Sequence, residues 1–398
     1  MTSTIENAKS MQAELVSMRR YLHANPELNF VEYKTSKYAA EKLTALGFSV
    51  RQIGGETGLV AEFGSGKTTI AIRCDMDGLP ISELNRTTFA SQTAGVMHAC
   101  GHDAHLACTL GAAAILSQSK LSGRIRIIIQ PGDNADGKVG ATTMLEAGAL
   151  EGVTALLGLH VDATVPTGKV GIVTGATMPS VQRFTISING NENANGTVDH
   201  ASQSASESAS DRALTVAKTV CELYKAPALF KAAGSATDQV SISVQSMQSG
   251  YNQAVEQEGI ENQNCAQISG TLKTYSAEMQ KQVQEQIEKI AKTFDSNSTV
   301  EFERCIEQTV SSAAVTNILN DAAVDIIGAN NVLAIKRKSW NYQFTLLTEK
   351  VPGAMIYLGA ELSSSRRIHQ TATFDIDENC LPIGTAILAE AALRLFLA

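Results

Sequence analysis

The chain has 398 residues, of which 44% are hydrophobic, 18% charged and 5% aromatic. This composition is typical of a globular protein of two or three domains, and it excludes a disordered, collagen-like or disulfide-scaffold protein. The 32 basic and 40 acidic residues give a formal net charge of -8. An acidic chain without a basic run is a poor candidate for binding nucleic acid or an anionic membrane.

The predicted elements alternate between helices and strands over the first 160 residues. Helical periodicity covers residues 5–23 and 33–46, and further helices are expected near 104–118 and 140–150. Short apolar runs bounded by Gly, Asp or Pro are typical of buried strands, and they cover residues 59–63, 69–74, 125–130 and 154–159. This alternation predicts a three-layer α/β domain with a mainly parallel sheet.

The pattern changes after residue 180. An alternating strand, a helix, two β-rich runs and a second helix follow at 183–190, 211–225, 239–248, 265–274 and 276–294. After residue 298 the α/β pattern resumes, beginning with a strand at 300–305. We therefore predict a catalytic-type domain formed by residues 1–180 and 298–398, interrupted by a smaller α+β domain at 181–297.

Seven cysteines are an odd and sparse number for this length, which favours free thiols in a reducing compartment over a disulfide framework. The N-terminal segment has no uninterrupted apolar stretch of the kind found in secretory signals. No apolar run reaches the roughly 18 residues of a membrane span. We therefore expect a cytoplasmic protein that does not bind membranes.

The densest cluster of chemically active side chains is GVMHACGHDAH at residues 95–105, which contains three of the seven histidines. Thiolate and imidazole are the ligands that zinc and similar transition metals prefer. Cys100 and His102 are two positions apart, so both side chains can point to one side of an extended segment. The cluster therefore favours a metal site over a polar loop with a chance excess of histidine.

Acidic residues follow two of the predicted strands. Asp75 and Asp77 come at the end of the second strand, where α/β proteins collect functional groups. They could orient a metal-bound imidazole, bind a metal themselves or belong to a solvated turn. Asp133 follows the third strand and could act as a general base, whereas the neighbouring Asn134 could offer a metal only a neutral oxygen.

Two isolated histidines complete the candidate set. His160 follows the strand predicted at 154–159, and His369 follows a basic Arg-Arg-Ile segment near the C-terminus. Taken alone, either residue is more often structural than a ligand. Chance is nevertheless a poor explanation for several apolar strands that all end in candidate metal-binding or acid–base residues.

These segments resemble the aminoacylase, hippurate-hydrolase and auxin-conjugate-hydrolase branch of the zinc-dependent metallopeptidases, whose relatives include carboxypeptidases. The resemblance spans essentially the whole chain and is strongest in RCDMDGLPISE, GVMHACGHDAH, GLHVDATVPTGKVG and HQTATFDIDENCLPIG. It implies a two-metal catalytic domain, an inserted lid or dimerisation domain and a homodimer. It also implies a zinc or manganese enzyme that hydrolyses the amide of N-acyl amino acids or small peptide-like conjugates.

Carried over position by position, the resemblance implies that Cys100, His102, His160 and His369 are metal ligands. It also implies that Asp77 orients the metal-binding side.

The chain departs from the family pattern at positions close to the reaction. Asp133 and Asn134 stand where the family has two Glu residues, the general base and a metal ligand. The base is thus one methylene shorter and the ligand is neutral, which favours one bound ion rather than two. Gln343 replaces the Asp of the family's Ser-Glu-Asp-Phe motif.

The inserted domain departs from the pattern as well. Ala194 stands where the family carries the histidine that polarises the substrate carbonyl. Asn193 and Asn195 flank this position and His200 lies nearby, so these three residues are the expected substrate contacts.

Three functions remain open at the level of the sequence. The first is a metal-dependent amidohydrolase, the second is a pseudoenzyme that keeps the fold for binding, and the third is redirected lyase, isomerase or amide-forming chemistry in the same pocket. We rank the hydrolase first, because a purely structural descendant has no physical need for Cys100 and His102 as a pair.

Overall fold

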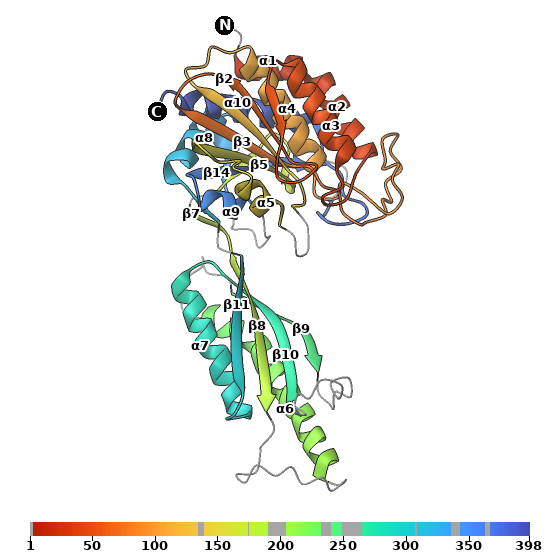
Figure 1. Ribbon diagram of the computed structural model, residues 1–398, viewed down its shortest axis with the longest axis vertical. Coiled ribbons are helices and arrows are strands. Elements are labelled where there is room, and N and C mark those ends of the chain that lie inside the picture. The colour runs from red at the N-terminus through yellow and green to blue at the C-terminus, as the bar shows by residue number, and fades with distance from the viewer. Residues whose placement is uncertain are drawn as a thin grey trace. The chain divides into compact units, whose positions relative to one another are not determined.

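The computed structural model describes residues 3–133, 139–173, 175–189, 204–231, 240–248, 265–306, 309–335, 343–362 and 367–398. The chain divides into two compact units (Figure 1). The larger unit comprises Met1–Thr177, Thr309–Lys336 and Tyr342–Ala398, and the smaller comprises Met178–Gln308 and Arg337–Asn341. In the described ranges, no helix is both long and apolar enough to cross a membrane.

In the part of the chain that the structure describes, the larger unit is built on an eight-stranded sheet. Its strands are β1 (Ser49–Gln52), β2 (Leu59–Gly64), β3 (Thr69–Asp75), β4 (Arg124–Gln130), β5 (Val153–Pro166), β6 (Val170–Ile172), β13 (Val332–Ala334) and β14 (Gly353–Glu361). The order across the sheet is β1-β2-β4-β3-β5-β14-β6-β13. The four central strands, β4, β3, β5 and β14, are parallel, so their carboxyl ends meet at one edge. A separate two-stranded pair consists of β7 (Gly175–Met178) and β12 (Thr309–Ser311).

Helices of the larger unit pack on this sheet and on one another. They are α1 (Thr4–Ser10), α2 (Gln12–Ala24), α3 (Tyr33–Ala45), α4 (His102–Ser117), α5 (Gly140–Glu146), α8 (Ala313–Ile327), α9 (Phe344–Thr348) and α10 (Leu381–Leu395). Helices α4 and α10 lie against β3 and β5, and α1 and α2 pack on these two helices. Helix α4 is therefore covered on all sides, which explains why it consists almost entirely of buried apolar and small residues.

The smaller unit has its own hydrophobic core. Its described residues form four strands, β8 (Ser180–Asn189), β9 (Ser241–Gln248), β10 (Cys265–Thr274) and β11 (Thr299–Ile306), and two helices, α6 (Ser204–Lys231) and α7 (Ala277–Phe294). The sheet is antiparallel with the order β11-β8-β10-β9. The Ser276 side chain caps α7, and Val283, Ile287 and Ile290 form the apolar stripe that this helix buries.

The predicted fold class is confirmed: a large, mainly parallel sheet with helices, and a second α+β unit. Two details differ from the prediction. Strand β5 does not end at residue 159 but continues to Pro166, because β14 pairs with it as far as Asp162 and beyond. Strand β11 belongs to the smaller sheet rather than to the larger domain, because it pairs with β8, and the unit boundary therefore lies at 308 instead of 298.

Candidate metal centre

The larger sheet brings the predicted metal-binding residues together at one edge. Asp75 ends β3 and Asp77 follows it, while Asp133 follows β4, the neighbouring parallel strand. His160 lies within β5, on the other side of β3. Cys100 precedes α4, which begins at His102 after Gly101, a residue in the left-handed conformation with φ 91°. These side chains thus converge from four segments that are distant in the sequence.

Cys100, His102 and His160 form a buried group whose ligand atoms all lie within 4.8 Å of one another. The Sγ of Cys100 is 3.5 Å from the Nε2 of His160. In a tetrahedral zinc site, bond lengths of about 2.3 Å to sulfur and about 2.0 Å to nitrogen place these two atoms roughly 3.5 Å apart. The observed spacing of this pair therefore fits a small divalent ion.

Hydrogen bonds fix which nitrogen of each histidine faces this group. The Nδ1 of His102 lies 3.2 Å from Oδ1 of Asp77, and the Nδ1 of His160 lies 2.6 Å from the carbonyl oxygen of Val161. In both rings Nε2 is therefore the nitrogen available as a ligand. The buried Nε2 of His102 has no hydrogen-bond partner among the described residues. A metal ion would satisfy this otherwise costly atom.

The electrostatic surroundings also favour a cation. Burial opposes the charged form of His102, but Asp75 and Asp77 outweigh it and raise the pKa of this residue well above its ordinary value. Burial raises the pKa of the Cys100 thiol and lowers the pKa of His160 well below its ordinary value. Neutral His160 is ready to coordinate, whereas Cys100 needs a nearby cation to lose its proton.

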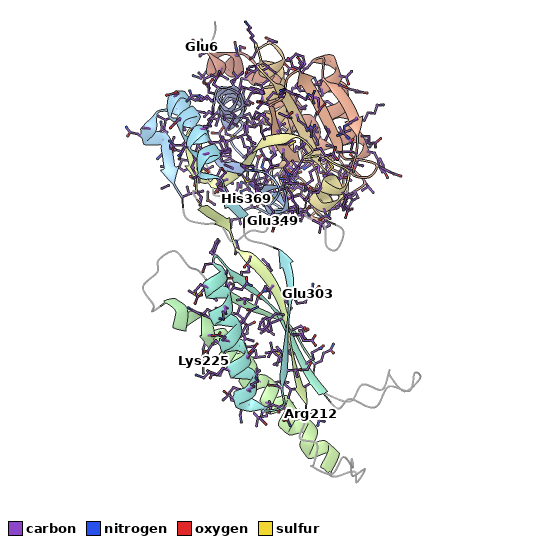
Figure 2. All side chains as sticks on the ribbon, turned by 60° about the vertical axis from the view of Figure 1, so that its left-hand side comes forward. Glu6, Arg212, Lys225, Glu303, Glu349 and His369 are labelled. Carbon is purple, nitrogen blue, oxygen red and sulfur yellow. The ribbon has the colours of Figure 1, made fainter. Side chains whose placement is uncertain are left out.

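His369 lies near this group but outside it. Its ring centroid is 5.5 Å from that of His160, and its Nε2 accepts a hydrogen bond of 3.1 Å from the backbone N–H of Ala163. The following residue, Gln370, has a φ of 60° and donates its N–H to the carbonyl oxygen of Ala99. This link ties the His369 loop, on the larger unit (Figure 2), to the segment that carries Cys100. The ligand role of His369 stays a prediction.

Asp133 is connected to the same centre through Asp77. Its backbone N–H donates to Oδ1 of Asp77 at 3.0 Å, and this oxygen also contacts the imidazole of His102. Oδ1 of Asp133 contacts Arg73 and accepts a hydrogen bond of 3.2 Å from Gln130. Burial raises the pKa of Asp133 against the opposing effect of Arg73. A buried carboxyl group with a raised pKa is suited to general-base catalysis.

Arg73 is a functional candidate that the motifs did not reveal. It is fully buried in β3, and its guanidinium holds two carboxylates, Asp75 at 2.7 Å and Asp133. A signal was present in the sequence, because an arginine inside an otherwise apolar strand must find buried acidic partners.

A second possible ligand group, Asp75, His102 and His105, also lies in this region. The Nδ1 of His105 is 2.6 Å from Oδ1 of Asp75, and its Nε2 accepts the N–H of Val161 at 3.0 Å. Because both nitrogens of His105 are engaged, this group is better described as a support for the strand ends than as an ion site.

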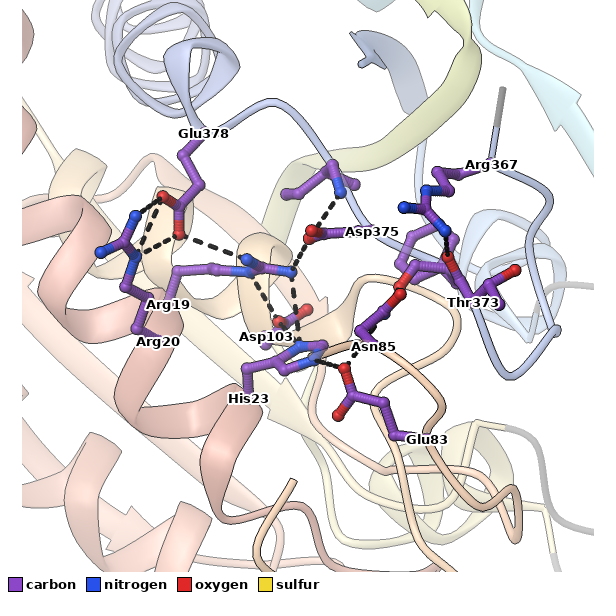
Figure 3. A network of polar contacts seen from close by, with 12 residues as sticks. Arg19, Arg20, His23, Glu83, Asn85, Asp103, Arg367, Thr373, Asp375 and Glu378 are labelled. Carbon is purple, nitrogen blue, oxygen red and sulfur yellow. Dashed lines mark hydrogen bonds and ion pairs between the residues drawn. The ribbon is translucent and has the colours of Figure 1, made fainter. Parts of the chain in front are cut away.

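Figure 3 shows a buried ionic network at the start of α4. Asp103, which follows the ligand candidate His102, pairs with Arg19 at 2.9 Å and with His23 at 2.7 Å. Arg19 also contacts Asp375 at 2.9 Å and Glu378 at 3.2 Å. Despite burial, Arg19 and His23 hold the pKa of Asp103 well below its usual range. The network therefore anchors the helix start that positions His102.

Several predicted site residues cannot be placed. Asn134, Asn193, Asn195 and His200 lie outside the residues that the structure describes. Their roles as weak ligand and substrate contacts stay predictions.

Residues 71–394 match the family model described as peptidase family M20/M25/M40. The chain belongs to this family. The resemblance inferred from the motifs is thus confirmed, and so is the enzyme class, a metal-dependent amidohydrolase.

Relatives and solved structures cover nearly the whole chain. The N-acetyl-L-cysteine deacetylase of Bacillus subtilis is 30% identical over 98% of this chain and 90% of its own length. The IAA-amino acid hydrolase ILR1-like 6 of Arabidopsis thaliana is 30% identical over 96% of this chain and 80% of its own length. A dinuclear metal-binding M20 peptidase from Bacillus subtilis matches with a TM-score of 0.80 at 27% identity, covering 98% of this chain and 99% of that structure.

The hydrogen bond that Asp77 accepts from His102 predicts a supporting role for Asp77 that can be measured as metal affinity. Asp77→Asn is expected to weaken metal binding about 10–100-fold, because the carboxylate that orients the imidazole becomes a neutral amide. Competition with a chromogenic chelator measures the affinity. Asp377→Asn is the control, since that carboxylate caps a short 3-10 helix (Glu378–Cys380) and should leave metal binding unchanged. Equal affinities for the two folded variants would contradict the prediction.

Proposed function

We propose that this protein cleaves the amide bond of N-acyl amino acids or small peptide-like conjugates. The observation that carries the proposal is the shared oxygen of Asp77, which contacts the ligand candidate His102 and the backbone of the base candidate Asp133. The ligand candidate His102 and the base candidate Asp133 are thereby held by the same carboxylate. The names of the relatives, a deacetylase of N-acetyl-L-cysteine and a hydrolase of IAA-amino acids, support this substrate class.

The metal that we propose is a single zinc or manganese ion. Cys100, His102 and His160 would hold it, with His369 as a fourth ligand after a small movement of its loop. One ion is favoured over two because the second site of the family depends on an anionic oxygen at position 134, which is Asn in this chain. When bound, a divalent ion polarises the scissile carbonyl and promotes ionisation of water.

The protein side chains supply the proton transfers. Among the described residues, Arg73 and Gln130 both contact Oδ1 of Asp133, and we therefore propose that Oδ2 accepts the proton from the attacking water. The protonated carboxyl group can then pass this proton to the leaving amine. Arg73 fixes the orientation of Asp133 and, through Asp75, links it to the end of β3. Asn193, Asn195 and His200 are proposed to contact the substrate.

A hydrolysis screen tests the proposed function. The metal-loaded protein is offered N-acetyl amino acids, N-benzoyl and indole-acetyl amino acids and dipeptides, and release of the free amino acid is measured. We expect turnover of at least one class, with typical enzymes reaching about 10 s⁻¹. If the folded, metal-loaded protein cleaves none of them, the result would favour a pseudoenzyme or redirected chemistry.

We also propose that the protein is a cytoplasmic homodimer that associates through the smaller unit. Among the described strands, β9 lies at one end of the sheet in that unit, which is a position where a second chain could pair. Light scattering at micromolar concentration is expected to give the mass of two chains. A monomeric mass would contradict this proposal, and so would an unchanged dimer after a proline is placed in β9, as in Ser243→Pro.

A further inference from the structure

The backbone of Gly132, just before Asp133, is held on three sides. Its N–H donates to Oε1 of Glu32 at 2.9 Å, and its carbonyl oxygen accepts a hydrogen bond of 2.9 Å from Gln343. Its φ is 58°, and a Cβ at this position would lie 2.6 Å from the ring of Phe30. A glycine is therefore required at position 132 by both conformation and space.

The side-chain amide of Gln343 uses its complete hydrogen-bonding capacity. Its Nε2 donates to the carbonyl oxygens of Gly132 and Asp133, each at 2.9 Å. Its Oε1 accepts from Nε2 of Gln130 at 3.0 Å and from the N–H of Ala141 at 2.8 Å. Two donors and two acceptor sites are thus satisfied by one buried group. The family motif has Asp at this position. A carboxylate could not donate either of the two hydrogen bonds to the carbonyl oxygens.

Glu32 completes the arrangement from the opposite side. It is fully buried, and its second oxygen accepts a hydrogen bond of 2.8 Å from the hydroxyl of Thr57. The same N-terminal segment supports the end of β3, because the carbonyl oxygen of Glu27 accepts the N–H of Gly78 at 2.7 Å. The strand ends that carry Asp77 and Asp133 are therefore held by one segment.

We propose that Gln343 is a positioning residue that, together with Glu32, fixes the Gly132–Asp133 peptide and so directs the carboxylate of Asp133 toward the reacting water. This inference rests on the proposed hydrolysis. An aspartate base reaches one methylene less far than a glutamate, so its backbone must be placed accurately. A misplacement of about 1 Å can lower a rate by about 100-fold.

Two variants separate the positioning effect from a general loss of structure. Gln343→Met removes all four hydrogen bonds without adding charge, and we expect kcat to fall about 10–100-fold with KM and metal content little changed. Gln343→Glu loses the two hydrogen bonds to the carbonyl oxygens of Gly132 and Asp133, so its kcat should also fall while KM stays nearly unchanged. A merely structural role would not separate kcat from KM in this way.

Gln182→Glu is the matched control. Gln182 has the same 6% exposed fraction as Gln343, and its oxygen accepts a hydrogen bond of 2.9 Å from Gln284 in the smaller unit. Its kcat and KM should equal those of the wild type. Amide hydrogen exchange should become faster at Ala141 in Gln343→Met but not in the control.

The outcomes distinguish this inference from the function on which it rests. A wild type that hydrolyses no substrate would overturn the proposed function itself. An active wild type would overturn the positioning role if the folded Gln343 variants kept kcat within about twofold. A fall in kcat that is fully explained by an equal loss of folded or metal-loaded protein would overturn it as well.

Discussion

Replacing Asp133 by Asn is expected to lower kcat for amide hydrolysis by about 10²–10⁴-fold, because the amide cannot accept the proton of the attacking water. KM and metal content should change little, since Asp133 is not among the three grouped ligand candidates. Steady-state kinetics with elemental analysis of the same samples measure both quantities. Arg73 keeps its contact with Asp75, so the variant should remain folded.

Asp133→Glu is the control for charge. It keeps a carboxylate that Arg73 can pair with and that can accept a proton, so its kcat should exceed that of Asp133→Asn, although the longer side chain displaces the carboxylate. An Asp133→Asn variant as active as the wild type would assign the proton transfer to another residue.

The buried network in Figure 3 predicts the largest effect on stability. Arg19→Met is expected to lower the free energy of unfolding by about 3–5 kcal/mol, because it leaves the buried carboxylate of Asp103 without its main partner. Urea denaturation followed by circular dichroism measures the change. The network lies entirely in the larger unit, so the unfolding of that unit is the transition in which the loss is expected.

Arg20→Met is the matched control in the adjacent position. Arg20 also pairs with Glu378, at 2.6 Å, but its side chain is 46% exposed. Its loss should therefore cost no more than about 1 kcal/mol. Equal decreases in the free energy of unfolding for the two variants would show that burial does not increase the contribution of these ion pairs to stability.

The same network gives stability a defined dependence on pH. The pKa of Asp103 is depressed in the folded state, so its contribution is complete above its unfolded pKa of about 3.9 and decreases as the pH falls below that value. The difference in unfolding free energy between wild type and Arg19→Met should therefore narrow in acid.

Local features of the sequence were sufficient for the fold class and for part of the site. Periodicity distinguished buried strands from helices, and the short spacing of Cys100 and His102 was enough by itself to indicate a metal group. His160 could be associated with them only because strand ends of parallel sheets meet at one edge. His160 lies within β5, and not at the end of this strand, because β5 continues past it by pairing with β14.

The supporting residues could not be predicted in the same way. The bond between Glu32 and Gly132 spans 100 positions, and that between Gln343 and Gly132 spans 211. Hydrogen bonds between such distant residues leave no periodic signal in the sequence. The sequence pattern places β11 in the larger domain for a related reason, because its partner β8 precedes it by more than a hundred residues.

The most direct test of the metal centre is the hydrolytic activity of the purified protein before chelation, after chelation and after return of zinc or manganese. We predict that activity is lost with the metal, returns with it, and is absent in Cys100→Ala. The buried Cys108, whose Sγ contacts the carbonyl oxygen of Leu381, provides the control variant Cys108→Ala, which should behave like the wild type. Hydrolysis that survives complete metal removal, or a fully active, metal-loaded Cys100→Ala variant, would contradict a catalytic metal held by Cys100.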